Sequence, residues 1–170
     1  MNKRFTLAIT TPSPQELCMT RIFDAPRALV FDAFTKPQLL SRWLLGPEGW
    51  TMPVCEIDLT VGGRYRYVWR HRDGRQMAMG GVYREIVVPE RVVATELFDE
   101  DWTGGETLST LQLVEVDGAT TMTTTVLYGS QKARDAALAT GMKEGLETGY
   151  NRLDEILSVA KAGGHARRSA

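Results

Sequence analysis

The residues from Gln131 to Ala160 form a long proline-free segment in which apolar side chains recur at helical spacing. Ser130 is a favourable N-cap residue before this segment, and Gly163 and Gly164 behind it favour a helix end. On a helix, its apolar and small residues would lie on one face; they are Leu138, Met142, Gly145, Leu146, Gly149, Leu153, Ile156 and Leu157. The pattern predicts one amphipathic helix that lies along an apolar layer.

Within this segment Gly141, Gly145 and Gly149 recur at every fourth residue. A glycine inside a helix costs about 1 kcal/mol relative to alanine, so three of them need a reason. They permit close packing of the helix backbone on a sheet, or they leave space for a bound molecule between helix and sheet. The spacing fits both explanations equally well.

Ahead of the helix, runs of strand-forming residues alternate with turn signals. Asp73–Gly74 and Asp117–Gly118 are typical of hairpin turns, and Gly80–Gly81 is interpreted as a bulge. The expected strands are 16–23, 54–59, 64–72, 76–87, 91–98, 107–116 and 120–128. Two short helices, 27–35 and 37–44, separate the first strand from the others.

Connections between neighbouring strands favour an antiparallel sheet, and the last helix would cover one face of it. The sequence therefore predicts an α+β domain with a curved antiparallel sheet of about six to seven strands. We expect residues 1–14 to be an N-terminal lead-in that pairs as an edge or stays loose. Residues 15–161 would form the single domain, followed by a flexible tail over 162–170.

The 170 residues carry a formal net charge of −1 without a basic or acidic block. Such a balance argues against nucleic acid as a partner, because nucleic-acid binding requires a basic surface. No apolar run is long enough for a signal peptide or a membrane span, so a cytoplasmic location is expected. Two cysteines, Cys18 and Cys55, are too few for a disulfide framework and are expected to be buried free thiols. No spacing of metal-ligating residues is present, and we expect neither a metal nor a cofactor.

Several segments together resemble one known family. Residues 30–37 (VFDAFTKP) and 42–47 (RWLLGP) are similar to the opening of the SRPBCC (START-like, Bet v 1-like) superfamily, in particular its activator of heat-shock-protein-ninety ATPase homologue-like branch. Residues 56–58 with 62–66, and 73–74 with 81–86 and 89–93, resemble later motifs of that branch. The resemblance extends from about Leu17 to Leu157. The chain departs from it at Leu44, where the family usually has a second tryptophan.

The resemblance implies a helix-grip fold, in which the curved sheet and the long C-terminal helix enclose a cavity. Relatives bind hydrophobic or amphipathic small molecules, and some of them cyclise polyketides. A binder or sensor of a hydrophobic or aromatic ligand is therefore the first functional hypothesis. An enzyme of the polyketide cyclase or hydrolase kind and a co-chaperone-like interaction domain are the alternatives, and dimerisation stays open.

The expected pocket is apolar. Tyr65, Tyr67 and Trp69 alternate with arginines along one strand and therefore share the face that points at the helix. Taken singly, each candidate is explained by core packing; taken together, and with the resemblance, they predict a ligand pocket. The set comprises Phe34, Trp43, Trp50, Tyr65, Tyr67, Trp69, Met79, Met142, Gly145, Leu146, Gly149 and Leu153.

Catalytic residues are harder to assign. His71 lies beside a hairpin turn between two arginines and is interpreted as a surface residue, and neither cysteine has an evident histidine partner. The enzyme hypothesis would depend on Tyr65, Tyr67, Glu56 or Glu85, with a carboxylate or tyrosine pair turned into the pocket. We expect the two glutamates to lie at the surface, and we assign no catalytic residue.

Overall fold

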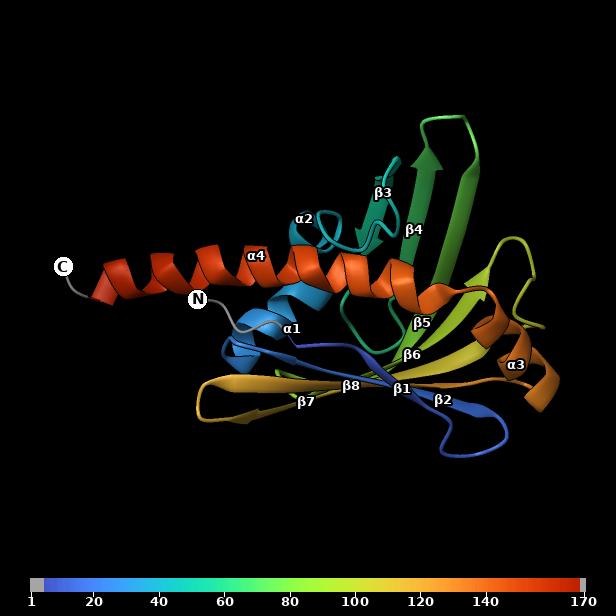
Figure 1. Ribbon diagram of the computed structural model, residues 1–170, viewed down its shortest axis with the longest axis horizontal. Coiled ribbons are helices and arrows are strands. Elements are labelled where there is room, and N and C mark those ends of the chain that lie inside the picture. Colours follow the sequence, from blue (N-terminus) through green and yellow to red (C-terminus); the bar gives the residue numbers. More distant parts are fainter. Residues whose placement is uncertain (1–4, 169–170) are drawn as a thin grey trace.

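The computed structural model describes residues 5–168, which form an eight-stranded antiparallel sheet and four helices (Figure 1). The strands are β1 (Ala8–Thr10), β2 (Glu16–Phe23), β3 (Trp50–Ile57), β4 (Arg64–His71), β5 (Gln76–Val87), β6 (Arg91–Phe98), β7 (Thr107–Val116) and β8 (Ala119–Leu127). The helices are α1 (Arg27–Thr35), α2 (Pro37–Leu40), α3 (Gln131–Ala139) and α4 (Met142–Arg168). The predicted α+β class with an antiparallel sheet and a long C-terminal helix is confirmed, with eight strands in place of six to seven.

The sheet is open and strongly curved. Its strand order is β1-β2-β8-β7-β6-β5-β4-β3, so the chain crosses from β2 through α1 and α2 to the far edge and then returns strand by strand. Figure 1 shows α4 lying across the concave side of this sheet. The two edge strands are irregular or short: β1 has three residues, and β3 contains Pro53 and a register shift between Thr51 and Val54.

Strand β4 shows why the sheet has one buried face. Tyr65, Tyr67 and Trp69 are buried, whereas Arg64 and Arg70 are exposed. This alternation follows from the two-residue period of a strand, as the sequence predicted. The aromatic side chains consequently project from the concave face toward α4.

The single helix predicted for residues 131–160 is two helices. The side chain of Ser130 caps α3 as predicted by accepting a hydrogen bond from the backbone N–H of Ala133. Gly141 then has a positive φ of 72°, a conformation that ends a right-handed helix, and a new helix begins at Met142. The predicted stop at Gly163–Gly164 is also wrong, because α4 continues to Arg168.

Two other expectations are resolved. The lead-in pairs as an edge, with Ile9 opposite Met19. The bulge predicted at Gly80–Gly81 is wrong, since both glycines pair regularly with β4, and the irregularity of β5 lies between Tyr83 and Glu85. Gly81 has another role: a Cβ atom there would overlap the backbone oxygen of Thr95 on the neighbouring strand.

The interior has a solid part and a hollow part. Where α1 and the second half of α4 meet the sheet, apolar side chains pack without exposure, including Phe23, Val30, Leu113, Met122 and Leu153. The buried guanidinium of Arg21 lies in the same region; its Nη2 pairs with Asp154 at 2.5 Å and donates to Asn151 at 3.0 Å. The first half of α4 covers the hollow part. No helix between residues 5 and 168 combines the length and apolar composition needed to cross a bilayer.

Candidate ligand-binding cavity

A cavity of about 480 Å³ lies between the concave face of the sheet and the first half of α4. Inward-facing residues of β4 to β8 form its floor, α4 forms its roof, and the segment from Trp43 to Trp50 lies at its rim. Most of its wall is apolar. The aromatic residues on the wall are Phe34, Trp43, Trp50, Tyr65, Tyr67, Trp69, Tyr83, Phe98, Trp102, Tyr128 and Tyr150.

Nearly all of the predicted pocket residues lie on this wall. They are Phe34, Trp43, Trp50, Tyr65, Tyr67, Trp69, Met79, Met142, Gly145, Leu146 and Gly149. Leu153 does not belong to the wall. It is fully buried one turn beyond Gly149, where α4 has passed from the cavity to the solid core.

The aromatic residues of β4 and β5 form a continuous surface. The ring centroids of Tyr65 and Tyr67 are 4.9 Å apart, those of Tyr67 and Trp69 are 5.9 Å apart, and Tyr83 lies 5.4 Å from Tyr65. Contacts of this kind contribute about 0.5–1.5 kcal/mol each beyond area burial. The surface is therefore fixed before any ligand binds.

The polar atoms of these rings have partners within the protein. Tyr65 donates to the backbone oxygen of Thr95 at 2.7 Å, and Trp69 donates to the backbone oxygen of Leu44 at 2.7 Å. Tyr67 and Tyr83 hydrogen bond to each other. Burial raises the pKa of Tyr67 well above its ordinary value and raises that of Tyr83 to about 12, so both phenols are neutral at physiological pH. A ligand thus meets ring surface with hydroxyl groups already engaged.

The rim is anchored by Trp43. Its Nε1 donates to the backbone oxygen of Ala33 at 2.9 Å, and its ring packs against Phe34 and Tyr150 at centroid distances of 4.8 and 5.5 Å. Leu44, at which the chain departs from the resemblance described above, lies on the cavity wall next to it. The smaller side chain leaves the rim more open there than a second indole would.

The glycines of the last helical region have three different roles. A Cβ atom on Gly149 would lie 2.8 Å from the backbone oxygen of Trp43, so this glycine permits close packing. A Cβ atom on Gly145 would find its nearest neighbour, Pro47, at 3.6 Å, and this glycine faces the cavity. Gly141 ends the preceding helical turn. Close packing therefore explains Gly149, and Gly145 borders the cavity without such a contact.

Sequence reasoning missed Glu96, which lies on the cavity wall in β6. Its Oε2 is 3.5 Å from the hydroxyl of Thr107, the residue paired with it on β7, and Ser109 also hydrogen bonds to it. Burial raises the pKa of Glu96, and these two hydrogen bonds oppose the increase only in part. The signal for Glu96 was available, because it has the same strand parity as the inward-facing Val92 and Phe98.

The glutamates that the enzyme hypothesis named lie outside the cavity. Glu56 and Glu85 are exposed, and Glu85 pairs with Arg91 at 3.2 Å. Cys18 and Cys55 are free and half-buried, and burial raises the pKa of Cys55 to about 11, which makes it a poor nucleophile at neutral pH. Among the described residues, no group of histidine, cysteine, aspartate and glutamate side chains is arranged to hold a metal ion.

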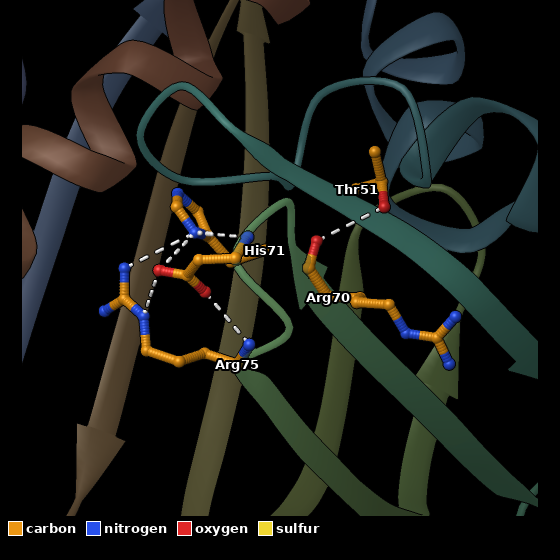
Figure 2. A network of polar contacts seen from close by, with 5 residues as sticks. Thr51, Arg70, His71 and Arg75 are labelled. Carbon is orange, nitrogen blue, oxygen red and sulfur yellow. Dashed lines mark hydrogen bonds and ion pairs between the residues drawn. The ribbon is translucent and has the colours of Figure 1, made fainter.

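His71 belongs to a polar network at the β4–β5 hairpin, shown in Figure 2. Its Nδ1 lies 2.8 Å from Asp73 Oδ2, which Arg75 also contacts at 2.8 Å. The hydrogen bond from the backbone N–H of Arg75, with smaller contributions from His71 and the Arg75 side chain, lowers the pKa of Asp73 to about 2. The His71 ring packs on Trp50 at 5.1 Å. The half-buried His71 thus supports a rim residue and is not on the cavity wall.

Comparisons with known proteins agree with this geometry. The sequence model described as activator of Hsp90 ATPase homolog 1-like protein matches residues 24–158. A Rhodobacter sphaeroides protein of known crystal structure is 37% identical, with a TM-score of 0.86 over 91% of this chain and 99% of the other. A solution structure from Arthrobacter aurescens is 25% identical, with a TM-score of 0.77 over 89% and 91% of the two chains.

A solution structure of an AHSA1-like protein from Aeromonas hydrophila shares the fold at 18% identity, with a TM-score of 0.65 over 82% of this chain and 93% of the other. No protein with a curated description matches the chain. The family model covers most of the domain, from the residue after β2 into the second half of α4. The chain therefore belongs to the activator of Hsp90 ATPase homolog 1-like family.

Proposed function

We propose that this protein binds a hydrophobic or aromatic small molecule in the cavity between the sheet and α4. The observation that supports this function best is the cavity itself. Its volume of about 480 Å³ is within the range of small-molecule sites, and its wall is largely aromatic and aliphatic. The protein acts as a non-catalytic binder or sensor in this proposal.

The cavity wall is preorganised for such a ligand. Tyr65, Tyr67, Trp69 and Tyr83 hold each other in place, and their polar atoms are paired. Binding then requires little ordering of side chains, which is a principal cost of association. The ligand gains contact with a large apolar surface that would otherwise remain in contact with water.

A matched pair of variants on β8 tests this proposal. Thr124 lies on the cavity wall, and its neighbour Thr125 projects from the opposite face of the sheet. We expect Thr124→Phe to fill part of the cavity and to weaken binding of the neutral fluorescent probe N-phenyl-1-naphthylamine at least about tenfold. Thr125→Phe should bind it as the unmodified protein does. Failure of the unmodified protein to bind the probe, or equal affinities of the two folded variants, would refute the proposal.

A search for the natural ligand complements the probe experiment. The protein purified from its own host should be measured by native mass spectrometry and then extracted with organic solvent. A bound compound at about one per chain is the expected result, and its extract would identify the chemical class. The Thr124→Phe variant prepared in the same way should carry less of it.

A second candidate function is proton transfer to or from such a ligand, and Glu96 is the observation that favours it. A carboxyl group in an apolar cavity has a raised pKa and is suited to general acid or base work. If the protein converts the extracted compound, Glu96→Gln should abolish the conversion and keep the affinity for a neutral ligand. A co-chaperone-like role predicted a filled core, and the cavity gives that role no support.

A further inference from the structure

The charged groups on the cavity wall are unevenly distributed. Among the described residues of the wall, Glu96 alone carries a carboxyl group, and none is lysine, arginine or histidine. From this arrangement we propose that the cavity selects ligands carrying a protonated amine, which pairs with Glu96, and rejects ligands carrying a carboxylate. The inference rests on the proposed binding function and specifies the chemical class of ligand.

The described side chains around Glu96 give its carboxyl group hydrogen bonds but no positive charge. Thr107 and Ser109 on β7 provide hydroxyl groups to the carboxyl group but no charge. Glu96 also acts electrostatically on Tyr65 of β4, on Tyr128, which directly follows β8 in the sequence, and on Tyr150 of α4. Burial raises the pKa of all three phenols, so they too stay uncharged. Arg21 also acts on Tyr150, but its guanidinium pairs with Asp154 in the solid core and is not on the described wall. A ligand amine can therefore provide the positive partner that the wall does not give to an ionised Glu96.

Aromatic rings on the same wall favour a cation over an anion. The negative face of an aromatic ring attracts an ammonium group, by about 0.5–2 kcal/mol according to how dry the site is. Tyr65, Tyr128 and Tyr150 lie on the same wall, and Glu96 acts electrostatically on all three. A charge-assisted hydrogen bond to the carboxylate adds to this attraction. An anionic ligand would lose its hydration without gaining either interaction.

Amine binding is expected to release a proton. In the free protein, burial favours the neutral form of Glu96, and a cation beside the carboxyl group favours the ionised form. The affinity for an amine should therefore rise with pH through the pKa that Glu96 has in the free protein. The affinity for a neutral analogue has no such dependence, because the facing tyrosines do not titrate in this range.

Three probes that share a naphthyl group test the inference on the intact protein: 2-(1-naphthyl)ethylamine, 2-(1-naphthyl)ethanol and 1-naphthylacetate. Isothermal titration calorimetry between about pH 5 and pH 8, in buffers of different ionisation enthalpy, gives affinities and protons released. We expect the amine to bind about tenfold more tightly than the alcohol at the upper pH, with proton release. The acetate should bind more weakly than the alcohol.

The variant Glu96→Gln keeps the shape of the side chain and removes its charge. It should lose the preference for the amine and the proton release, and it should bind the alcohol as before. Glu85→Gln, which removes an exposed carboxyl group from the adjacent strand, should change neither. If Glu96→Gln does not fold, the pH dependence of the unmodified protein decides the question.

The outcomes separate this inference from the function on which it rests. If the three probes bind equally, or if the amine keeps its preference and proton release in Glu96→Gln, the amine inference is wrong and the binding function stands. If the acetate binds best, the inference is likewise overturned. Binding of none of the three would count against both proposals.

Discussion

The backbone oxygen of Trp43 lies 2.8 Å from the position that a Cβ atom would take on Gly149. No side chain fits between the rim segment and α4 at this point. The contact sets how closely α4 approaches the rim, while one turn earlier a Cβ atom on Gly145 would only touch Pro47, at 3.6 Å. Both glycines line the cavity, and the solid core begins one turn beyond Gly149, at the fully buried Leu153.

Alanine substitutions at these two glycines should have opposite effects on stability. Gly149→Ala forces the added methyl group against backbone, and we expect it to lower the free energy of unfolding by about 1–3 kcal/mol. Gly145→Ala meets Pro47 at an ordinary contact distance and gains up to about 1 kcal/mol from helix propensity. Urea denaturation of both variants measures the difference, and equal effects would contradict the assigned roles.

Two methionines should distinguish core from cavity wall. Met122 is fully buried in the solid core, and Met142 is half-buried on the cavity wall. We expect Met122→Ala to cost about 2–5 kcal/mol of unfolding free energy, because it creates a hole in packed surroundings. Met142→Ala should cost well below this range, since its side chain already borders open space. A loss at Met142 as large as that at Met122 would show that the cavity is filled in solution.

Trp43 should contribute to stability through its hydrogen bond as well as through its buried ring. Trp43→Phe leaves the buried backbone oxygen of Ala33 without its donor, and an unsatisfied group of this kind costs about 1–3 kcal/mol. Trp102 is exposed, so Trp102→Phe is the control, with an expected effect within about 0.5 kcal/mol. The midpoints of urea unfolding compare the two variants directly.

Strand alternation and family motifs predicted most of the fold. The inward direction of Tyr65, Tyr67 and Trp69 followed from the two-residue period, and the structure places all three on the cavity wall. The break at Gly141 could not be found in the same way. Apolar residues continue at helical spacing on both sides of it, so the hydrophobic period hides a local change in φ.

Glu96 was missed for a different reason. The predicted bounds of β6 and β7 are confirmed, but strand bounds alone do not indicate on which face of β6 Glu96 lies. Glu96 alternates along β6 with Val92, Ala94 and Phe98, which line the cavity, so it lies on the same concave face. Its position on the cavity wall also depends on the curvature of the sheet and on the space under α4, which the sequence does not show. Leu153 was predicted on the pocket wall but lies in the solid core, because helical spacing does not indicate where a cavity ends.

The raised pKa of Glu96 predicts a particular dependence of stability on pH. The folded protein holds a proton on Glu96 above the ordinary pKa of 4.5, where the unfolded chain has released it. The contribution of Glu96 to stability is therefore fully present below about pH 4.5 and is lost as the pH rises through the folded-state pKa.

Each pH unit between the two pKa values reduces that contribution by about 1.4 kcal/mol. Relative to Glu96→Gln, the unmodified protein should thus become less stable as the pH rises from about 4.5 to its folded-state pKa, as urea unfolding at several pH values would show. A constant difference between the two proteins would mean that Glu96 is ionised in the free cavity.

The two sheet edges also determine how copies of this chain can meet. The hydrogen-bonding groups of β1 extend over three residues, and Pro53 with the register shift interrupts those of β3. A foreign strand finds no long, regular ladder to extend at either edge. Both features disfavour edge-to-edge pairing of this open sheet with the sheet of another chain.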